Sequence, residues 1–232
     1  MESIWNRPAR AARGPRPAHS RDDIARAAVA VADTEGLDAV SMRRVAAELG
    51  TGTTSLYRYL SSKDDLIDLM VDAVLSEHAP PEPTGKWRAD LRELAERTRA
   101  LMLRRPWFPL AAAARPGLGP GSLRWLEAWL RAVDGLGLDA DAMLAAVSTI
   151  QIFVHGSVAY EVAQRAAGYD AKTWLSAQGA YGDSIIASGA HPTLIRIMVE
   201  AEGPHRADQN ERLFASGLRQ VLDGLAAALP GG

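Results

Sequence analysis

The chain has 232 residues, of which 47% are apolar and 23% charged, the balance of an ordinary soluble globular protein with a core of its own. It contains no cysteine, which excludes a disulfide framework, a thiolate metal site and a cysteine nucleophile. The formal net charge of −2 excludes a protein that binds nucleic acid through its overall charge, so any such contact must be local.

The composition predicts an all-α fold, because alanine is frequent and long alternating runs of β-branched residues are absent. The start of the chain lacks the apolar centre of a signal peptide. The most apolar stretch, around Met143 to Val162, is interrupted by Gln151, His155 and Glu161, so we expect no membrane span. These features predict a cytoplasmic protein.

Residues 1–19 mix Arg, Pro, Gly and Ala without any period, which predicts a disordered basic arm. Its arginines, among them Arg13 and Arg16, are accompanied by a single acidic residue, Glu2. A basic arm ahead of a nearly neutral body favours a local contact with nucleic acid. The alternative is that the arm only keeps the chain in solution.

Three helices are expected to begin at serine caps between residues 20 and 79. Ser20 precedes two aspartates, and apolar residues then recur at helical spacing from Ile24 to Ala32. Gly36 is expected to end this helix. Ser41 and Ser62 are the expected caps of two later helices.

The stretch between the last two caps is the most informative part of the sequence. It reads SMRRVAAELGTGTTSLYRYLSSK, from Ser41 to Lys63. A short amphipathic run ends at Gly50, and a second short run rich in hydroxyl groups follows after only two residues. Two helices joined by such a tight turn form a helix-turn-helix, whose second helix enters the DNA major groove. The stretch therefore predicts a DNA-binding regulator.

The second helix of this motif offers candidate contacts of two kinds. Thr53 and Thr54, at its start, suit base edges, while Tyr57 and Lys63 suit phosphates. Each residue alone is also compatible with an ordinary helix start or a solvated charge, and only the whole pattern favours DNA. The candidate DNA-contacting residues are Arg43, Thr53, Thr54, Ser55, Tyr57, Arg58 and Lys63, with Arg13 and Arg16 of the arm.

A proline-rich stretch, residues 79–85, marks the expected domain boundary, because its prolines cannot continue a helix. It divides the chain into an arm (1–19), a helix-turn-helix domain (20–79) and a larger domain (84–232). The larger domain is expected to be helical throughout. Its predicted helices cover residues 87–105, 121–136, 140–167, 171–188, 192–201 and 207–229.

Residues 20 to 75 resemble the DNA-binding domain of the tetracycline-repressor (TetR) family of bacterial regulators. The pattern is Ser-x-Arg-x-Val-Ala-x-x-Leu-Gly-x-Gly-Thr-x-Ser-Leu-Tyr-Arg-Tyr-Leu-x-x-Lys-x-x-Leu. The resemblance implies an N-terminal three-helix DNA-binding domain in an all-helical homodimer, with a C-terminal domain that dimerises and binds a small effector. It implies that Arg43, Thr53, Thr54, Tyr57 and Lys63 occupy DNA-contacting positions.

The sequence also departs from the family pattern. Thr51-Gly52 stands where Val-Ser is common, and Tyr59-Leu60 stands where His-Phe is common. Gly52 therefore weakens the usual side-chain cap of the recognition helix. The arginine arm resembles extensions that enter the adjacent minor groove in some members.

The larger domain fits this plan in its own residues. The predicted helix 143–167 carries small residues at three- and four-residue spacing, and the last helix carries a broad apolar stripe. These two helices from each subunit predict a four-helix interface, with burial inside one subunit as the alternative. Candidate effector contacts, each of which is also compatible with a purely structural role, are Trp107, Trp125, Trp129, Gln151, His155 and Trp174.

No motif in the sequence supports an enzyme, and we expect neither a metal nor a cofactor. The five histidines show no metal-ligand spacing, and Gly117 to Gly121 lacks the lysine of a phosphate loop. The expected function is a homodimeric repressor that leaves a palindromic operator when a small, largely apolar effector binds. The alternatives are a DNA-binding regulator without a small ligand and a helical small-molecule-binding or catalytic protein with a vestigial helix-turn-helix.

Overall fold

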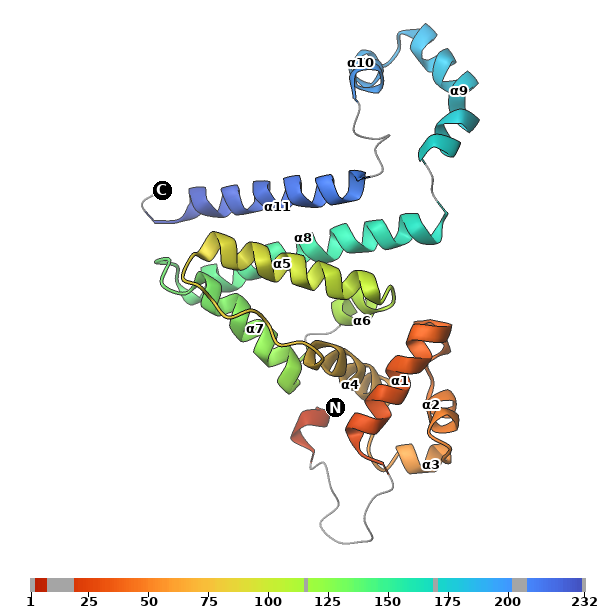
Figure 1. Ribbon diagram of the computed structural model, residues 1–232, viewed down its shortest axis with the longest axis vertical. Helices are drawn as coiled ribbons and strands as arrows, with labels where there is room; N and C mark the ends of the chain where they lie inside the picture. Colours follow the sequence, from red (N-terminus) through yellow and green to blue (C-terminus); the bar gives the residue numbers. More distant parts are fainter. Residues whose placement is uncertain (1–2, 8–18, 115–116, 169–170, 202–207, 231–232) are drawn as a thin grey trace.

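The computed structural model describes residues 3–7, 19–114, 117–168, 171–201 and 208–230. All regular secondary structure in these ranges is helical, as the composition predicts (Figure 1). The elements are η1 (Ile4–Asn6), α1 (Arg21–Glu35), η2 (Leu37–Ala39), α2 (Met42–Glu48), α3 (Thr53–Leu56), α4 (Lys63–Ser76), α5 (Trp87–Arg104), α6 (Phe108–Ala114), α7 (Pro120–Val133), α8 (Ala140–Ala166), α9 (Ala171–Ser188), α10 (Pro192–Glu200) and α11 (Gln209–Ala228).

Local sequence signals account for most of the helix boundaries. The three serine caps are confirmed, since Ser20, Ser41 and Ser62 each accept a hydrogen bond from the backbone N–H three residues later. Gly36 ends α1 with φ of +86°, a conformation that favours glycine. The six helices predicted after residue 84 agree with α5 and α7 to α11 within three residues at each end. Helix α6 is not predicted, because its seven residues are too few to establish a period.

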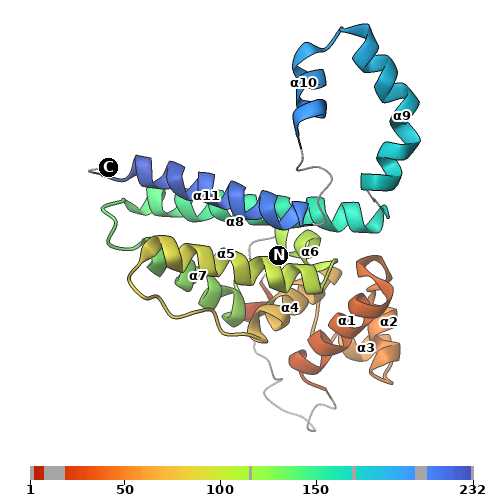
Figure 2. The ribbon, with the colours of Figure 1, turned by 45° about the horizontal axis from the view of Figure 1, so that its top comes forward.

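Helices α1 to α3 form a small unit around the first half of α4. Helix α1 packs against α4 and α2, and α2 packs against α3. Ile24, Val45, Leu56 and Leu66 are among the fully buried side chains that join these helices. The helix-turn-helix therefore lies at one end of the molecule, and α4 leads from it into the larger domain (Figures 1 and 2).

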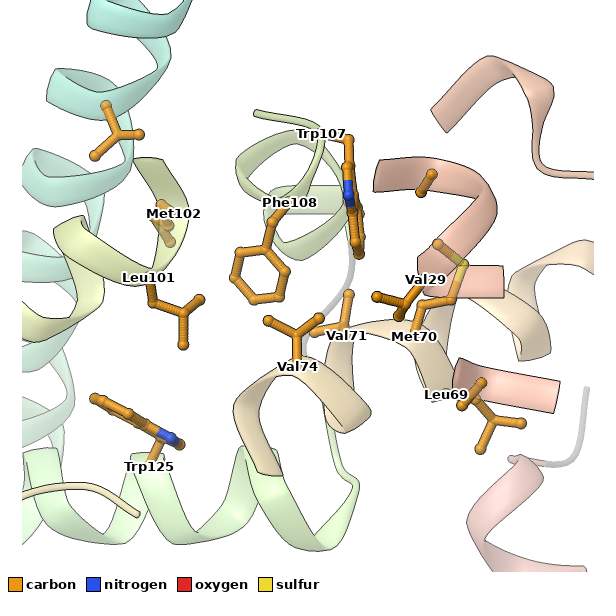
Figure 3. Close-up of a cluster of buried hydrophobic side chains, with 14 of the residues drawn as sticks. Val29, Leu69, Met70, Val71, Val74, Leu101, Met102, Trp107, Phe108 and Trp125 are labelled. Carbon is orange, nitrogen blue, oxygen red and sulfur yellow. The ribbon is translucent and has the colours of Figure 1, made fainter. Parts of the chain in front are cut away.

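Helix α4 also belongs to the core of the larger domain. Val71 and Val74 face Phe108 and Trp125, which come from α6 and α7 (Figure 3). The indole N–H of Trp125 donates to the carbonyls of Leu75, at 3.0 Å, and His78, at 3.3 Å, at the end of α4. One helix thus shares its packing between the unit formed by α1 to α3 and the larger domain.

Helices α5, α7, α8 and α11 make up the body of the larger domain. Helix α8 packs against α5, α7 and α11, and α11 lies beside it in both views (Figures 1 and 2). Phe153 and Phe214 stack with ring centroids 5.6 Å apart, and Gly217 lets the helices approach, because a Cβ there would lie 2.6 Å from Phe153 Cε2. The guanidinium of Arg99 lies 4.9 Å from the ring centroid of Phe214 and pairs with the buried carboxylate of Glu161.

Helices α9 and α10 project away from this body (Figures 1 and 2). They expose large apolar side chains, including Tyr181, Leu194, Ile197 and Val199. By length and composition, helix α8 is also long and apolar enough to cross a membrane. No such helix is expected from the sequence. Only 22% of its most apolar 18-residue window is buried. One such window is weak evidence of a membrane span.

Candidate functional site

The helix-turn-helix exposes most of its predicted contact residues. Helix α3 is a single turn whose cap, Gly52, makes no side-chain hydrogen bond, as the sequence predicts. Thr54, Tyr57 and Arg58 are exposed, whereas Leu56 is buried. Helical spacing puts residues 53, 54, 57 and 58 on one side of this turn, opposite the core. The short helix can therefore present these side chains to a groove.

The remaining predicted contacts flank this surface. Thr53 and Ser55 are half-buried, and Arg43 is exposed on α2. The guanidinium of its neighbour Arg44, by contrast, binds the carboxylates of Glu35 and Glu48 at 2.6 and 2.9 Å. Arg43 is thus the arginine of this pair whose side chain points to solvent. Arg13 and Arg16 lie outside the described residues.

Lys63 is exposed in the first turn of α4, beside the cap Ser62. A helix N-terminus with a lysine suits a phosphate, because backbone N–H groups and the helix dipole favour an anion there. The carboxylate of Asp65 lies nearby, but it is paired with Arg7 and accepts a hydrogen bond from the N–H of Ser61. It therefore repels a bound phosphate less than an unpaired carboxylate would. Burial raises the pKa of Asp65, but these hydrogen bonds and the charge of Arg7 outweigh it and hold the pKa below its ordinary value.

A cavity of about 220 Å³ lies between α4 and the larger domain. Four of the predicted effector contacts line it, namely Trp125, Trp129, Gln151 and His155. The other lining residues are Val71, Leu75, Thr98, Met102, Phe108, Ala112, Gly117, Ser122 and Leu126. Most of these side chains are apolar, and a few are hydrogen-bonding groups, which is the usual composition of a small-molecule site.

One predicted effector residue, Trp107, does not line this cavity. Trp107 packs beside Phe108 toward α1 (Figure 3), and its indole N–H donates to Asp33 at 2.6 Å. This hydrogen bond links the residue before α6 to α1. The side chain of Trp174 lies outside the described residues.

The polar groups of the cavity include two that the sequence does not reveal. Thr98 Oγ1 and Ser122 Oγ are buried, with no hydrogen-bond partner among the residues that the structure describes, and Ser122 is only 8% exposed. A buried hydroxyl group without a partner costs free energy, which a ligand oxygen or nitrogen can recover. His155 Nδ1 lies 2.8 Å from the carbonyl of Gln151, so Nδ1 carries the proton and Nε2 can accept.

Ser122 also connects the cavity to α4. Its backbone N–H donates to the buried carboxylate of Asp72 at 2.8 Å, which caps the start of α7. Gly119 and Gly121 pack so closely on Asp72 that neither has room for a side chain. Together with the indole of Trp125, this contact ties two cavity-lining residues directly to the helix that carries Lys63.

Comparison with known proteins gives matches to both halves of the chain. Residues 24–70 match the family described as "Bacterial regulatory proteins, tetR family", and residues 79–229 match "Tetracyclin repressor-like, C-terminal domain". The HTH-type transcriptional repressor DrrR1 of Streptomyces coeruleorubidus is 39% identical, over 97% of this chain and 84% of its own length. The tetracycline repressor class A from transposon 1721 of Escherichia coli is 30% identical, over 88% of each chain.

Solved structures agree with these matches. The Streptomyces coelicolor TetR family protein ActR in complex with actinorhodin superposes with a TM-score of 0.75 and 27% identity, over 93% of this chain and 99% of ActR. Apo ActR gives a TM-score of 0.73 and 28% identity, over 92% and 97% of the two chains. The arrangement of helices described above is therefore that of these regulators.

Proposed function

The chain belongs to the TetR family of bacterial transcriptional regulators, and from this premise we propose that it is a homodimeric repressor released from a palindromic operator by a small, largely apolar effector. Repression itself follows from the family. The observation that supports an effector is the cavity whose lining residues, Ser122 and Trp125, also bond to α4. We propose Arg43, Thr53, Thr54, Ser55, Tyr57, Arg58 and Lys63 as its operator contacts.

An apolar face of α8 supports the homodimer. Ile152 and Tyr160 are exposed, and the small residues Gly156, Ala159 and Ala163 lie between and beyond them on the same helical face. Contiguous exposed apolar surface of this kind is typical of an interface between subunits, and small residues let helices approach closely. With α11 beside α8, two subunits would bury this face in a four-helix interface.

The dimer is tested by measuring mass and operator binding together. We expect size-exclusion chromatography with light scattering to give twice the mass of the 24.9 kDa chain at micromolar concentration. Ile152→Glu, at a side chain 71% exposed, should yield monomers and abolish cooperative operator binding. Leu110→Glu, at a side chain 70% exposed on α6, is the matched control and should stay dimeric. A monomeric wild-type protein would refute the dimer.

The cavity indicates the chemical class of the effector. The indoles of Trp125 and Trp129 and the ring of Phe108 favour a flat aromatic molecule. The hydroxyls of Thr98 and Ser122 favour hydroxyl or carbonyl groups on that molecule. ActR, which shares this fold, binds actinorhodin, so we propose compounds of that kind as the first candidates.

The size of the cavity supports release by displacement. At about 220 Å³ it is smaller than the ~300–1,000 Å³ typical of small-molecule sites. A larger effector must therefore move part of the wall, and Val71 and Leu75 make the α4 side of that wall. Displacement of α4 would move Lys63 and change the spacing of the two recognition helices, which must match two half-sites.

A thermal-shift screen with Ser122→Ala tests the effector site. A compound that binds the folded dimer should raise Tm, since binding to the native state adds to stability. Ser122→Ala should weaken binding by about 5- to 15-fold, the effect of one lost hydrogen bond of about 1–1.5 kcal/mol, because it removes Oγ but keeps the N–H on Asp72. Ser184→Ala, exposed on α9, is the control. Equal affinity in both variants would place the ligand elsewhere.

A further inference from the structure

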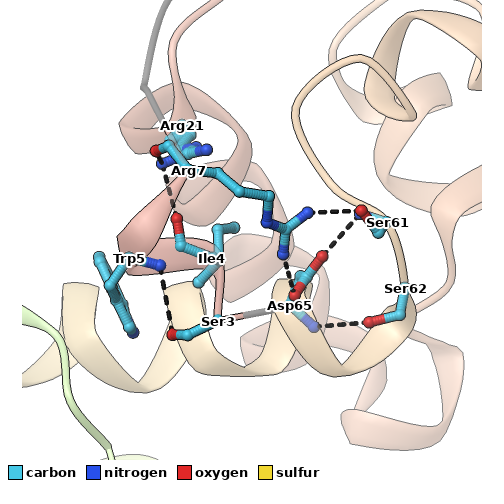
Figure 4. A network of polar contacts seen from close by, with 8 residues as sticks. All are labelled: Ser3, Ile4, Trp5, Arg7, Arg21, Ser61, Ser62 and Asp65. Atoms are coloured by element: carbon cyan, nitrogen blue, oxygen red, sulfur yellow. Dashed lines mark hydrogen bonds and ion pairs between the residues drawn. The ribbon is translucent and has the colours of Figure 1, made fainter. Parts of the chain in front are cut away.

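The first described residues of the chain fold back onto the DNA-binding unit. Residues 3–7, here called the N-terminal clasp, contain η1 and lie across α1 and the start of α4 (Figure 4). Ile4 is 0% exposed, which is unusual so close to a chain terminus. Arg21 Nη1 donates to the carbonyls of Ile4 and Arg7, both at 3.0 Å. This part of the predicted disordered arm is therefore folded.

Arg7 joins the clasp to the segment that leads from α3 into α4. Its Nη2 lies 2.6 Å from Asp65 Oδ1, and its Nη1 donates to Ser61 Oγ at 2.5 Å (Figure 4). Asp65 Oδ2 in turn accepts from the N–H of Ser61 at 2.6 Å. These contacts hold Ser61, two residues before Lys63, and Asp65, two residues after it. The Arg7 side chain is only 19% exposed, so the ion pair is largely shielded from water and salt.

The clasp reaches the larger domain as well. Trp5 lies against Gly119, where a Cβ would come 2.5 Å from Trp5 Cζ2. Gly119 precedes α7 and packs on Asp72 of α4, the residue that caps α7. These five residues thus contact α1, Asp65 near the start of α4, and the turn before α7, which itself packs on Asp72. They hold α4 at the place where it passes between the two domains.

We propose that the N-terminal clasp positions the operator-contacting end of α4, and that Arg7 is a positioning residue that does not itself touch DNA. The proposal rests on the proposed function, in which Lys63 binds an operator phosphate. Without Arg7, Ser61 Oγ loses a hydrogen bond, and the buried carboxylate of Asp65, two residues from Lys63, loses its ion pair while keeping the hydrogen bond from the N–H of Ser61. Both changes disfavour a phosphate at this helix end, the first by loosening it and the second by repulsion.

The test compares operator binding by full-length variants at several salt concentrations. We expect Arg7→Ala to weaken binding about tenfold while the slope of log K against log salt stays unchanged, because no phosphate contact is lost. Ile4→Ala, at a buried side chain that cannot reach DNA, should weaken binding in the same direction. Asn6→Ala, at the exposed clasp residue between them, should bind like the wild type. A normal thermal-shift response to ligand would show that the larger domain of each variant is folded.

Two results would overturn the proposed role of the N-terminal clasp. One is a salt slope that falls by about 0.9 for each Arg7 removed, which would make Arg7 a direct phosphate contact. The other is unchanged affinity in both Arg7→Ala and Ile4→Ala. Failure of the proposed function is recognised separately, because wild-type binding would then be unaffected by Lys63→Ala.

Discussion

Replacing Lys63 with alanine and Tyr57 with phenylalanine in one chain is expected to weaken operator binding by about a hundredfold or more. Lys63 lies at the start of α4, where it and the backbone N–H groups favour a phosphate, and Tyr57 exposes its hydroxyl group on α3. A hydrogen bond to a charged group contributes about 1.5–3 kcal/mol, and a dimer presents each contact twice. A loss of about 3 kcal/mol corresponds to a hundredfold change in affinity.

Fluorescence anisotropy of labelled DNA, taken from the intergenic region upstream of the gene, measures this effect. The salt slope should also fall by about 0.9 for each Lys63 removed, since Tyr57→Phe removes no charge, whereas Arg7→Ala should leave the slope unchanged. Lys86→Ala is the matched control, because Lys86 is an exposed lysine next to the start of α5 and far from the recognition helix. Equal losses in the Lys63 and Lys86 variants would contradict the assigned interface.

Arg99→Ala is expected to lower the free energy of unfolding by about 3–5 kcal/mol, the cost of breaking a buried ion pair. Arg99 Nη2 donates to Glu161 Oε2 at 2.8 Å and joins α5 to α8, while its guanidinium covers Phe214 of α11. Removing it leaves the buried carboxylate of Glu161 with Arg165, whose side chain is 60% exposed. Three helices of the larger domain therefore lose a shared contact.

Urea denaturation measures this loss, with Arg97→Ala as the control on the same helix. Arg97 pairs with Glu93 across one turn of α5, and both side chains are exposed enough that the pair should contribute no more than about 0.5 kcal/mol. Similar losses for the two arginines would show that the Arg99–Glu161 pair contributes no more to the free energy of unfolding than an exposed pair.

The parts of the fold that the sequence predicts are those that short-range signals determine. Serine caps, Gly36 and the proline-rich stretch act on neighbouring residues, so helix boundaries follow from them. The helix-turn-helix follows for the same reason. These signals require no knowledge of which distant residues meet.

The contacts that the sequence does not predict join residues far apart in the chain. Arg7 meets Asp65, 58 residues later, and Asp72 meets Ser122, 50 residues later. Trp107 resembles the other tryptophans in sequence, yet its indole binds Asp33, 74 residues earlier, and does not line the cavity. The buried hydroxyls of Thr98 and Ser122 belong to common residue types with no characteristic spacing. Their roles depend on the packing of five helices around one cavity.

In the proposed function, a ligand in the cavity and an operator at the recognition helices are coupled through α4. By linkage, an effector that favours the released state must bind more weakly to the operator-bound dimer than to the free dimer. Asp72 and the indole of Trp125 make the contacts that we expect to transmit this effect.

The most direct measurement is a titration of the preformed complex of dimer and upstream DNA with actinorhodin, or with another flat aromatic compound that raises Tm. We expect the anisotropy to fall to that of free DNA as the ligand saturates the cavity, and Ser122→Ala to shift the titration to higher ligand concentration. A ligand that binds the cavity and leaves the operator affinity unchanged would show that the two sites are not coupled.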